Sequence, residues 1–373
     1  MTKVAAVKAS CYDKQVVGQA MQELLNELGG ISEFIKHGET VLIKPNMLEG
    51  VKKELSVTTH PEVVRSVIRQ VKNVGAIPLV GDSPGVGSTV KAAEKCGTLK
   101  VCQEEQAELL PFKDVVQIPF PQGRTVKKFT VAKALTEADK VISLAKMKTH
   151  SFMGITGAVK NLFGFIVGTD KAQFHLRMKK RDDFACMLVD LVELVRPVLY
   201  IVDGIVGMDG NGPRNGTPYQ AGVLLAGTDG FAVDAVMAEM MGFQAEKLPI
   251  ACYAGTLGLC PAFADIELIG SGKDLRFNFK EPHSYESLDS RLPGRLVDFC
   301  RQQFTAKPYV AANCIGCGRC AAHCPPAAIS MIKEKAVINH DKCIRCYCCQ
   351  ELCPENAVYL KDGMLLKLMK QKK

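Results

Sequence analysis

The cysteines of this chain are concentrated in one short stretch near its C-terminal end. Nine of the 16 cysteines lie between Cys314 and Cys353, and the other seven are scattered over the rest of the 373 residues. Eight of the nine form two runs with the same spacing, and each run ends in proline. The runs are Cys314, Cys317, Cys320, Cys324, Pro325 and Cys343, Cys346, Cys349, Cys353, Pro354. A secreted disulfide scaffold would be small and rich in cysteine throughout, so the pattern indicates metal binding in a cytoplasmic protein.

The spacing is typical of bacterial ferredoxins with two 4Fe–4S clusters, in which the fourth cysteine of each run ligates the other cluster. Structural zinc is the alternative, but zinc sites use two ligand pairs separated by a longer arm. Cys348 lies outside the repeat, and we expect it to be a small packing residue unless it replaces Cys349 as a ligand. We therefore expect two clusters, one on Cys314, Cys317, Cys320 and Cys353, and one on Cys343, Cys346, Cys349 and Cys324.

The chain divides into two parts with different patterns. In residues 1–304, short apolar runs such as Thr40–Ile43 alternate with amphipathic helical patterns such as Pro61–Val74. This alternation predicts an α/β domain with a mostly parallel sheet and helices on both faces. Residues 305–373 should form a small α+β ferredoxin-like domain, preceded by a docking helix at Ser287–Phe304. Its short strands are expected to pair as Ala327–Ile332 with Ala336–Asn339, and Ala357–Lys361 with Met364–Leu366.

The composition argues against a membrane or nucleic-acid protein. Hydrophobic residues make up 47% of the chain, yet no apolar run reaches the roughly 18 residues that a membrane helix needs. The formal net charge is +8, but two oxidised clusters with four thiolates each would contribute about −2 apiece. The chain has no tryptophan and only 6% aromatic residues, so it lacks the basic and aromatic interleaving used in base stacking. We expect neither a membrane span nor a nucleic-acid partner.

Polar residues follow each predicted strand of the large domain. In open α/β sheets the ligand crevice lies at the carboxyl ends of the strands, so these residues should gather at one edge. We expect some of them to bind a cofactor or anionic group, namely Lys44, Asn46, Lys148 and Gly157. We expect others to be catalytic, namely His150, Lys160, Asp82 and Asp203.

Two glycine-containing segments could bind an anion. In Lys146–Gly164, lysines and His150 bracket three small residues, and glycines let backbone N–H groups approach a ligand. The second segment, Gly81–Ser88, lacks the Gly-Lys-Ser/Thr of a P-loop and the third glycine of a dinucleotide fingerprint. Kinase and Rossmann dehydrogenase functions are therefore disfavoured. The basic stretch Lys171–Arg181 is better explained as a solvated helix face.

Six segments of the large domain match motifs of one known family, namely Ile43–Asn46, Gly81–Gly85, Lys148–His150, Lys160–Gly164, Ile201–Gly204 and Gly210–Pro213. With these motifs and the two cysteine runs, the whole chain resembles a family of iron–sulfur proteins that carry the conserved domain of unknown function 362, followed by a two-cluster ferredoxin module. The resemblance implies this two-domain architecture and its clusters, but the family declares no activity. The segment from His150 to Lys160 is also similar to the part of lactate racemases where a lysine carries a nickel-pincer nucleotide. That similarity would make Lys160 an attachment point and His150 an acid–base group.

Three functions are compatible with these features. The favoured one is a ferredoxin-coupled oxidoreductase, in which the clusters feed electrons to a substrate or cofactor in the crevice. The lysines would bind an anionic group, and His150 would supply protons, because an unperturbed histidine has a pKa near ~6.5. The second is an electron carrier or adaptor whose large domain binds a redox partner protein without catalysis. The third is a nickel-pincer-type isomerase. Substrate, electron donor and oligomeric state stay open.

Overall fold

A mostly parallel nine-stranded sheet organises the first domain, in the order β11-β1-β10-β9-β7-β2-β3-β4 with β8 added on β7. The structure is a computed structural model that describes residues 1–168, 170–282 and 305–363. The β1–β10, β10–β9 and β7–β8 pairs are antiparallel and the others parallel, which confirms the predicted sheet type. The strands are β1 (Thr2–Lys8), β2 (Thr40–Pro45), β3 (Ile77–Val80), β4 (Glu108–Leu109), β7 (Lys140–His150), β8 (Gly154–Thr156), β9 (Leu199–Asp209), β10 (Thr217–Gly227) and β11 (Ile266–Ile269).

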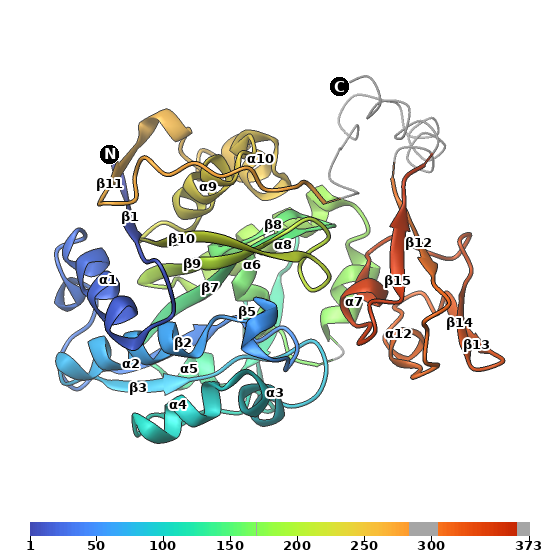
Figure 1. The fold of residues 1–373 in the computed structure, drawn as a ribbon, viewed down its shortest axis with the longest axis horizontal. Helices are drawn as coiled ribbons and strands as arrows, with labels where there is room; N and C mark the ends of the chain where they lie inside the picture. Colours follow the sequence, from blue (N-terminus) through green and yellow to red (C-terminus); the bar gives the residue numbers. More distant parts are fainter. Residues whose placement is uncertain (169, 283–304, 364–373) are drawn as a thin grey trace.

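Helices cover both faces of this sheet, as predicted (Figure 1). Side chains alternate along each strand, so that Val4 and Ala6 join one apolar core while Ala5 and Val7 join the other. Helices α1 (Lys14–Asn26) and α2 (Pro61–Asn73) pack on one face, and α8 (Arg181–Val195) and α9 (Gly230–Met241) on the other. None of the described helices is both long and apolar enough to cross a membrane. The other helices are α3 (Thr89–Cys96), α4 (Thr98–Glu104), α5 (Ala134–Glu137), α6 (Ala158–Asn161), α7 (Asp170–Arg177) and α10 (Pro249–Thr256).

Helix α2 illustrates why these segments are helical. Pro61 occupies its first turn, where its fixed φ suits a helix and its missing N–H costs nothing. His60 precedes it as the N-cap, and its ring Nδ1 accepts a hydrogen bond from the backbone N–H of Glu62. Val63, Val67 and other apolar side chains at helical spacing are buried against the sheet. Capping and periodicity therefore specify the same helix.

Two strands are longer than predicted, which changes the setting of several candidate residues. Strand β7 continues beyond Leu144 through His150 and then pairs with β8 as a hairpin. Strand β9 likewise continues past Asp203 to Asp209. The expected loops at Lys146–His150 and after Asp203 are therefore strand. The charged side chains in these segments find buried polar partners, as Lys146 does with Asp203, so the strands continue through them.

The C-terminal domain contains two short antiparallel strand pairs around the cysteine runs (Figure 1). The expected pairing of Ala327–Ile332 with Ala336–Asn339 is confirmed by β13 (Ile329–Ile332) and β14 (Lys335–Ile338). Strand β15 (Val358–Lys361) pairs with β12 (Lys307–Val310), and the expected pairing of Ala357–Lys361 with Met364–Leu366 stays a prediction. The first and last described strands thus close this domain on itself. The described helices of this domain are α12 (Arg319–Ala322) and α13 (Cys348–Glu351). Two segments for which the sequence predicts structure, Met364–Leu366 and Ser287–Phe304, lie outside the described residues.

Candidate active-site cavity and cluster-binding cysteines

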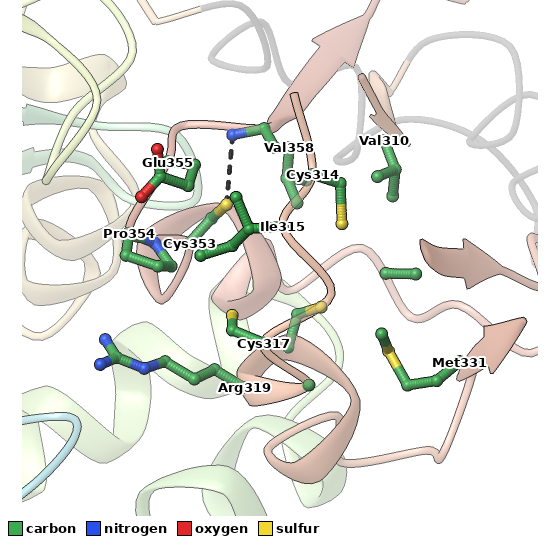
Figure 2. Close-up of a pocket in the computed structure, with 14 residues that line it drawn as sticks. Val310, Cys314, Ile315, Cys317, Arg319, Met331, Cys353, Pro354, Glu355 and Val358 are labelled. Carbon is green, nitrogen blue, oxygen red and sulfur yellow. Dashed lines mark hydrogen bonds between the residues drawn. The ribbon is translucent and has the colours of Figure 1, made fainter. Parts of the chain in front are cut away.

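The cysteines of the two runs form two groups of four, each lining its own small cavity. Figure 2 shows Cys314, Cys317 and Cys353 of the first group around one cavity, beside the apolar side chains of Ile315 and Met331. Cys320 completes this group, so three members come from the first run and one from the second. The other cavity is lined by Cys324, Cys343, Cys346 and Cys349 of the runs, and also by Cys348. The two groups are those expected from the sequence pattern.

The donor set fits a 4Fe–4S cluster. Each group supplies four thiols, the number that such a cluster uses, in a largely apolar setting. Backbone N–H groups also approach the sulfurs, as from Ala357 to Cys353 Sγ (3.1 Å; Figure 2) and from Ala328 to Cys324 Sγ (3.2 Å). Hydrogen bonds of this kind tune the potential of bound clusters. Ligation by these eight cysteines stays a prediction.

A cavity of about 910 Å³ lies between the two domains. The ferredoxin-like domain contributes Cys324 of the second cysteine group, the neighbouring Cys348, and Glu351. The α/β domain contributes the β3–α3 loop, α7 and several of the predicted site residues. Predicted residues that line it are Lys44, Asn46, Asp82, Lys148 and Lys160.

Lys44 and Asp82 form a buried ion pair in the wall of the cavity. Lys44 Nζ lies 2.7 Å from Asp82 Oδ1 and also donates to Asn161 Oδ1 (3.2 Å). The second carboxylate oxygen, Asp82 Oδ2, accepts a hydrogen bond from the backbone N–H of Met47 (2.8 Å). Burial lowers the pKa of Lys44, and the charge of Asp82 opposes that effect. A side chain at Gly164 would collide with this pair, since its Cβ would lie 2.0 Å from Asp82 Oδ1.

Lys148 and Lys160 line the cavity without an ion-pair partner within 4.0 Å among the described residues. Lys148 Nζ donates to Asn46 Oδ1 (3.0 Å) and to the carbonyl of Val57 (2.7 Å). Burial lowers the pKa of Lys148 well below its usual value. The Lys160 ammonium lies 5.7 Å from the centre of the Phe163 ring, and burial lowers its pKa as well. Two lysine amino groups therefore lie beside the cavity without a carboxylate partner, and an anion there would favour their charged forms.

His150 lies behind the cavity wall and faces the ferredoxin-like domain. Its Nδ1 accepts hydrogen bonds from the backbone N–H groups of Phe152 (3.0 Å) and Met153 (3.3 Å), so the neutral ring carries its proton on Nε2. His150 Nε2 lies 3.4 Å from Glu351 Oε1. Burial lowers the pKa of His150 well below its usual value, so a charged imidazolium is disfavoured there. Nothing in the sequence distinguishes Glu351 from any surface carboxylate, so sequence reasoning does not find it.

Gly157 does not line the cavity, because Asp234 occupies the backbone N–H groups that follow it. Asp234 accepts from the N–H groups of Ala158 (2.6 Å) and Val159 (3.0 Å). A Cβ at Gly157 would lie 2.0 Å from Asp234 Oδ1, so this close approach requires glycine. Burial raises the pKa of Asp234 to about 7. The expected anion cradle at Gly157 is therefore already filled by a carboxylate of the chain.

Asp203 belongs to a separate buried cluster and does not line the cavity. Lys146 Nζ lies 2.8 Å from Asp203 Oδ2, and the hydroxyl of Tyr12 donates to Asp203 Oδ1 (2.8 Å). The Tyr12 ring stacks on His60 with 3.6 Å between ring centroids. This network joins β7 and β9 to the segments that precede α1 and α2, and its geometry is that of a structural support. A catalytic role for Asp203 stays a prediction from the sequence alone.

The basic stretch of α7 is not simply a solvated face. Lys171 and His175 lie one turn apart on this helix, and both line the cavity. Lys171 Nζ donates to the carbonyl and hydroxyl oxygens of Ser83 (2.7 Å each), and burial lowers its pKa to about 7. Their i, i+4 spacing is visible in the sequence, but only the packing of α7 shows which side faces inward.

Contacts between the domains hold the cavity in shape. Glu49 Oε2 lies 2.6 Å from Arg214 Nε, and Glu49 Oε1 lies 3.3 Å from Arg319 of the ferredoxin-like domain. Arg214 also donates to Asn356 Oδ1 (2.8 Å), and Asn215 donates to the carbonyl of Gln350 (3.0 Å). The α/β domain is thus tied to both ends of the cysteine-containing segment.

Comparison with known proteins agrees with the two-part architecture. A family model described as "Domain of unknown function (DUF362)" matches residues 41–239, and a model described as "4Fe-4S dicluster domain" matches residues 313–357. The "Thylakoid-associated protein sll1697" of Synechocystis sp. is 33% identical over 299 residues, covering 78% of this chain and 91% of the relative. The ferredoxin YfhL of Escherichia coli is 37% identical over 59 residues, covering 14% of this chain and 69% of that protein.

One solved structure that the comparison matches is the lactate racemase apoprotein of Thermoanaerobacterium thermosaccharolyticum. The match has a TM-score of 0.38 and 14% sequence identity, and it covers 62% of this chain and 55% of the other.

Proposed function

Since this chain belongs to the DUF362 family and carries a 4Fe–4S dicluster domain, we propose that it is a ferredoxin-coupled oxidoreductase acting on a small anionic substrate or cofactor. The observation that carries the proposal is the cavity between the domains. Its wall combines Cys324 of the second cysteine group, and the neighbouring Cys348, with the lysines of the α/β domain. An occupant would therefore lie beside both an electron source and a cationic surface.

In this proposal the eight cysteines of the two runs hold two clusters, which supply one-electron transfer when bound. Lys148 and Lys160 attract and orient the anionic group. Lys160 is also a better proton donor than His150. Burial lowers its pKa and so makes its proton easier to release, whereas His150 is held neutral.

The charge of the lining supports an anionic occupant. Among the described residues, the cavity is lined by five lysines and three carboxylates. Asp82 is paired with Lys44, and Glu49 is paired with two arginines that compensate its charge. Glu351 is thus the remaining carboxylate against Lys148, Lys160 and Lys171, apart from Lys113, which is exposed to solvent. An anion would restore the balance and reduce the cost of burying these cations.

The test begins with anaerobic purification and analysis of iron and sulfide, for which two 4Fe–4S clusters require about eight of each per chain. The reduced protein is then mixed with a panel of small anions, and cluster reoxidation is followed by absorbance. We expect at least one anion to accelerate reoxidation, and Lys160→Met to slow it about tenfold or more. Lys95→Met, at an exposed lysine outside the cavity, is the matched control.

The proposal is wrong if every member of the panel leaves the rate unchanged, or if Lys160→Met and Lys95→Met behave alike. Reoxidation that occurs only with a partner protein would instead favour an electron carrier without its own catalysis.

A further inference from the structure

The cavity is larger than a small anion needs. Its volume of about 910 Å³ lies at the upper end of the range of roughly 300–1,000 Å³ that buries most of a drug-sized ligand. Much of its remaining lining is apolar, including Phe112, Phe163 and Leu176. Size and lining together indicate an organic molecule with an apolar body as well as a charged group.

The β3–α3 loop provides a place for the charged group. Strand β3 ends at Val80, and α3 begins at Thr89 with the Ser88 side chain accepting from the N–H of Lys91 (3.3 Å). Every residue from Ser83 to Val90 lines the cavity. The N-terminal end of a helix that follows a parallel strand attracts anions through its backbone N–H groups and its dipole.

A basic side chain completes this part of the wall. The ammonium of Lys171 is held on oxygen atoms of Ser83 and Pro84, at 2.7 and 3.3 Å, and no carboxylate among the described residues pairs with it within 4.0 Å. It is therefore fixed beside the loop while its charge is not neutralised.

Two buried polar atoms in the lining are independent evidence for a ligand. His175 is 7% exposed and Thr156 is 3% exposed, and both line the cavity. His175 Nδ1 and Thr156 Oγ1 have no hydrogen-bond partner in the part of the chain that the structure describes. Buried polar atoms without partners are uncommon and costly, and a ligand is one way to satisfy them.

We propose that the cavity binds a cofactor-sized phosphate monoester with a planar ring. Its phosphate lies against the Gly85–Ser88 loop and Lys171, and its ring lies along the apolar lining that includes Phe112 and Phe163. This inference rests on the proposed function, because it names the chemical class of the molecule that exchanges electrons in the same cavity. A phosphate monoester brings up to two negative charges, which matches the surplus of lysines.

The test is equilibrium binding to the intact, cluster-containing protein under anaerobic conditions. The probes are flavin mononucleotide, pyridoxal 5′-phosphate and AMP, each beside its dephosphorylated form. We expect at least one phosphate ester to bind about tenfold or more tightly than its partner compound, and inorganic phosphate to compete. Lys171→Met should weaken that binding about tenfold, Lys171→Arg should retain most of it, and Lys95→Met should leave it unchanged.

The inference is overturned if no phosphate ester binds more tightly than its dephosphorylated form, or if Lys171→Met binds as the unmodified chain does. Cluster reoxidation measured on the same samples separates the two proposals. If a carboxylate reoxidises the clusters but no compound binds through its phosphate, the phosphate ester is the wrong ligand class and the oxidoreductase proposal stands. If a phosphate ester binds through its phosphate but no anion reoxidises the clusters, the oxidoreductase proposal is wrong and the ligand class stands.

Discussion

Buried lysines are the unusual residues of this protein. Lys44, Lys146 and Lys148 are each 1% exposed or less, and two of them are neutralised by an aspartate at under 3 Å. Burying a charge costs several kcal/mol unless it is paired and hydrogen-bonded. The pairs account for Lys44 and Lys146, whereas Lys148 has only neutral acceptors. The paired lysines, Lys44 and Lys146, therefore stabilise the fold, whereas the unpaired Lys148 can still interact with an anionic ligand.

The Lys44–Asp82 pair gives a first prediction. Asp82→Asn leaves the buried ammonium without its counter-charge, so the free energy of unfolding should fall by about 3–5 kcal/mol. Urea unfolding of the cluster-containing protein measures this loss. The exposed pair Lys133–Glu137 provides a control, because Glu137→Gln should change stability by less than about 0.5 kcal/mol. Equal effects of the two substitutions would contradict the buried pairing.

His60 gives a pH prediction. Burial lowers its pKa to about 4 from an ordinary 6.5, so the unfolded chain takes up a proton before the folded one does. Its neutral form therefore stabilises the fold above about pH 6.5, and this contribution is lost as the pH falls toward 4. His60→Asn keeps a capping side chain without titrating. Between pH 7 and 5 we expect the variant to lose about 1–2 kcal/mol less stability than the unmodified chain. Parallel losses would show that His60 does not titrate in this way.

At the scale of elements, the glycine after α6 has a steric role. A Cβ at Gly164 would lie 2.0 Å from Asp82 Oδ1 and 2.5 Å from Lys44 Nζ, so Gly164→Ala should separate the pair and cost about 2–4 kcal/mol of stability. Gly18 in α1 has no atom within 4 Å of the position that a Cβ would occupy. Gly18→Ala should therefore stabilise the chain by about 0.5–1 kcal/mol. Thermal unfolding of the two variants should shift in opposite directions, and a common direction would contradict the steric argument.

Most elements could be predicted from the sequence, because periodicity and capping act locally. Helix α2 is the clear case, with Pro61, its cap and its apolar stripe all inside one segment. The ends of β7 and β9 could not be predicted in this way. Lys146 and Asp203 normally signal a loop, but they lie in strands because each neutralises the other across 57 positions of sequence. A charged residue usually indicates the end of a strand, but it can lie inside a sheet when a residue far away in the sequence neutralises it.

The candidate site shows the same limit. Lys44, Asp82, Lys148 and Lys160 could be found because they follow strands or family motifs, and the structure brings all four to one cavity. Glu351 and Lys171 could not, because their importance arises only where two domains meet or where α7 turns one face inward. Gly157 was expected in the cavity, but the backbone N–H groups that follow it bind the carboxylate of Asp234, which is distant in the sequence. Long-range packing, which leaves no local pattern, decides these cases.

At the scale of the whole molecule, Glu49 joins the domains by contacting both Arg214 and Arg319. Glu49→Ala removes both contacts and leaves the largely buried Arg214 without a carboxylate, so the domains should separate more often. We expect amide hydrogen exchange in α13 and in residues 83–90 to accelerate about tenfold, which corresponds to a decrease of about 1.4 kcal/mol in the free energy of local opening. Glu137→Ala on the surface of the α/β domain is the control. Unchanged exchange in both segments would show that other contacts are sufficient.

The cavity wall is built jointly, and this limits how the protein can be dissected. An α/β domain expressed alone would lack Cys324, Cys348 and Glu351, so the recess would open on one side to bulk water. A foreign ferredoxin grafted in its place would restore the electron supply without restoring that side. The two halves are therefore not interchangeable modules, and swapping experiments on such chains should transplant the contact residues together with the cysteines.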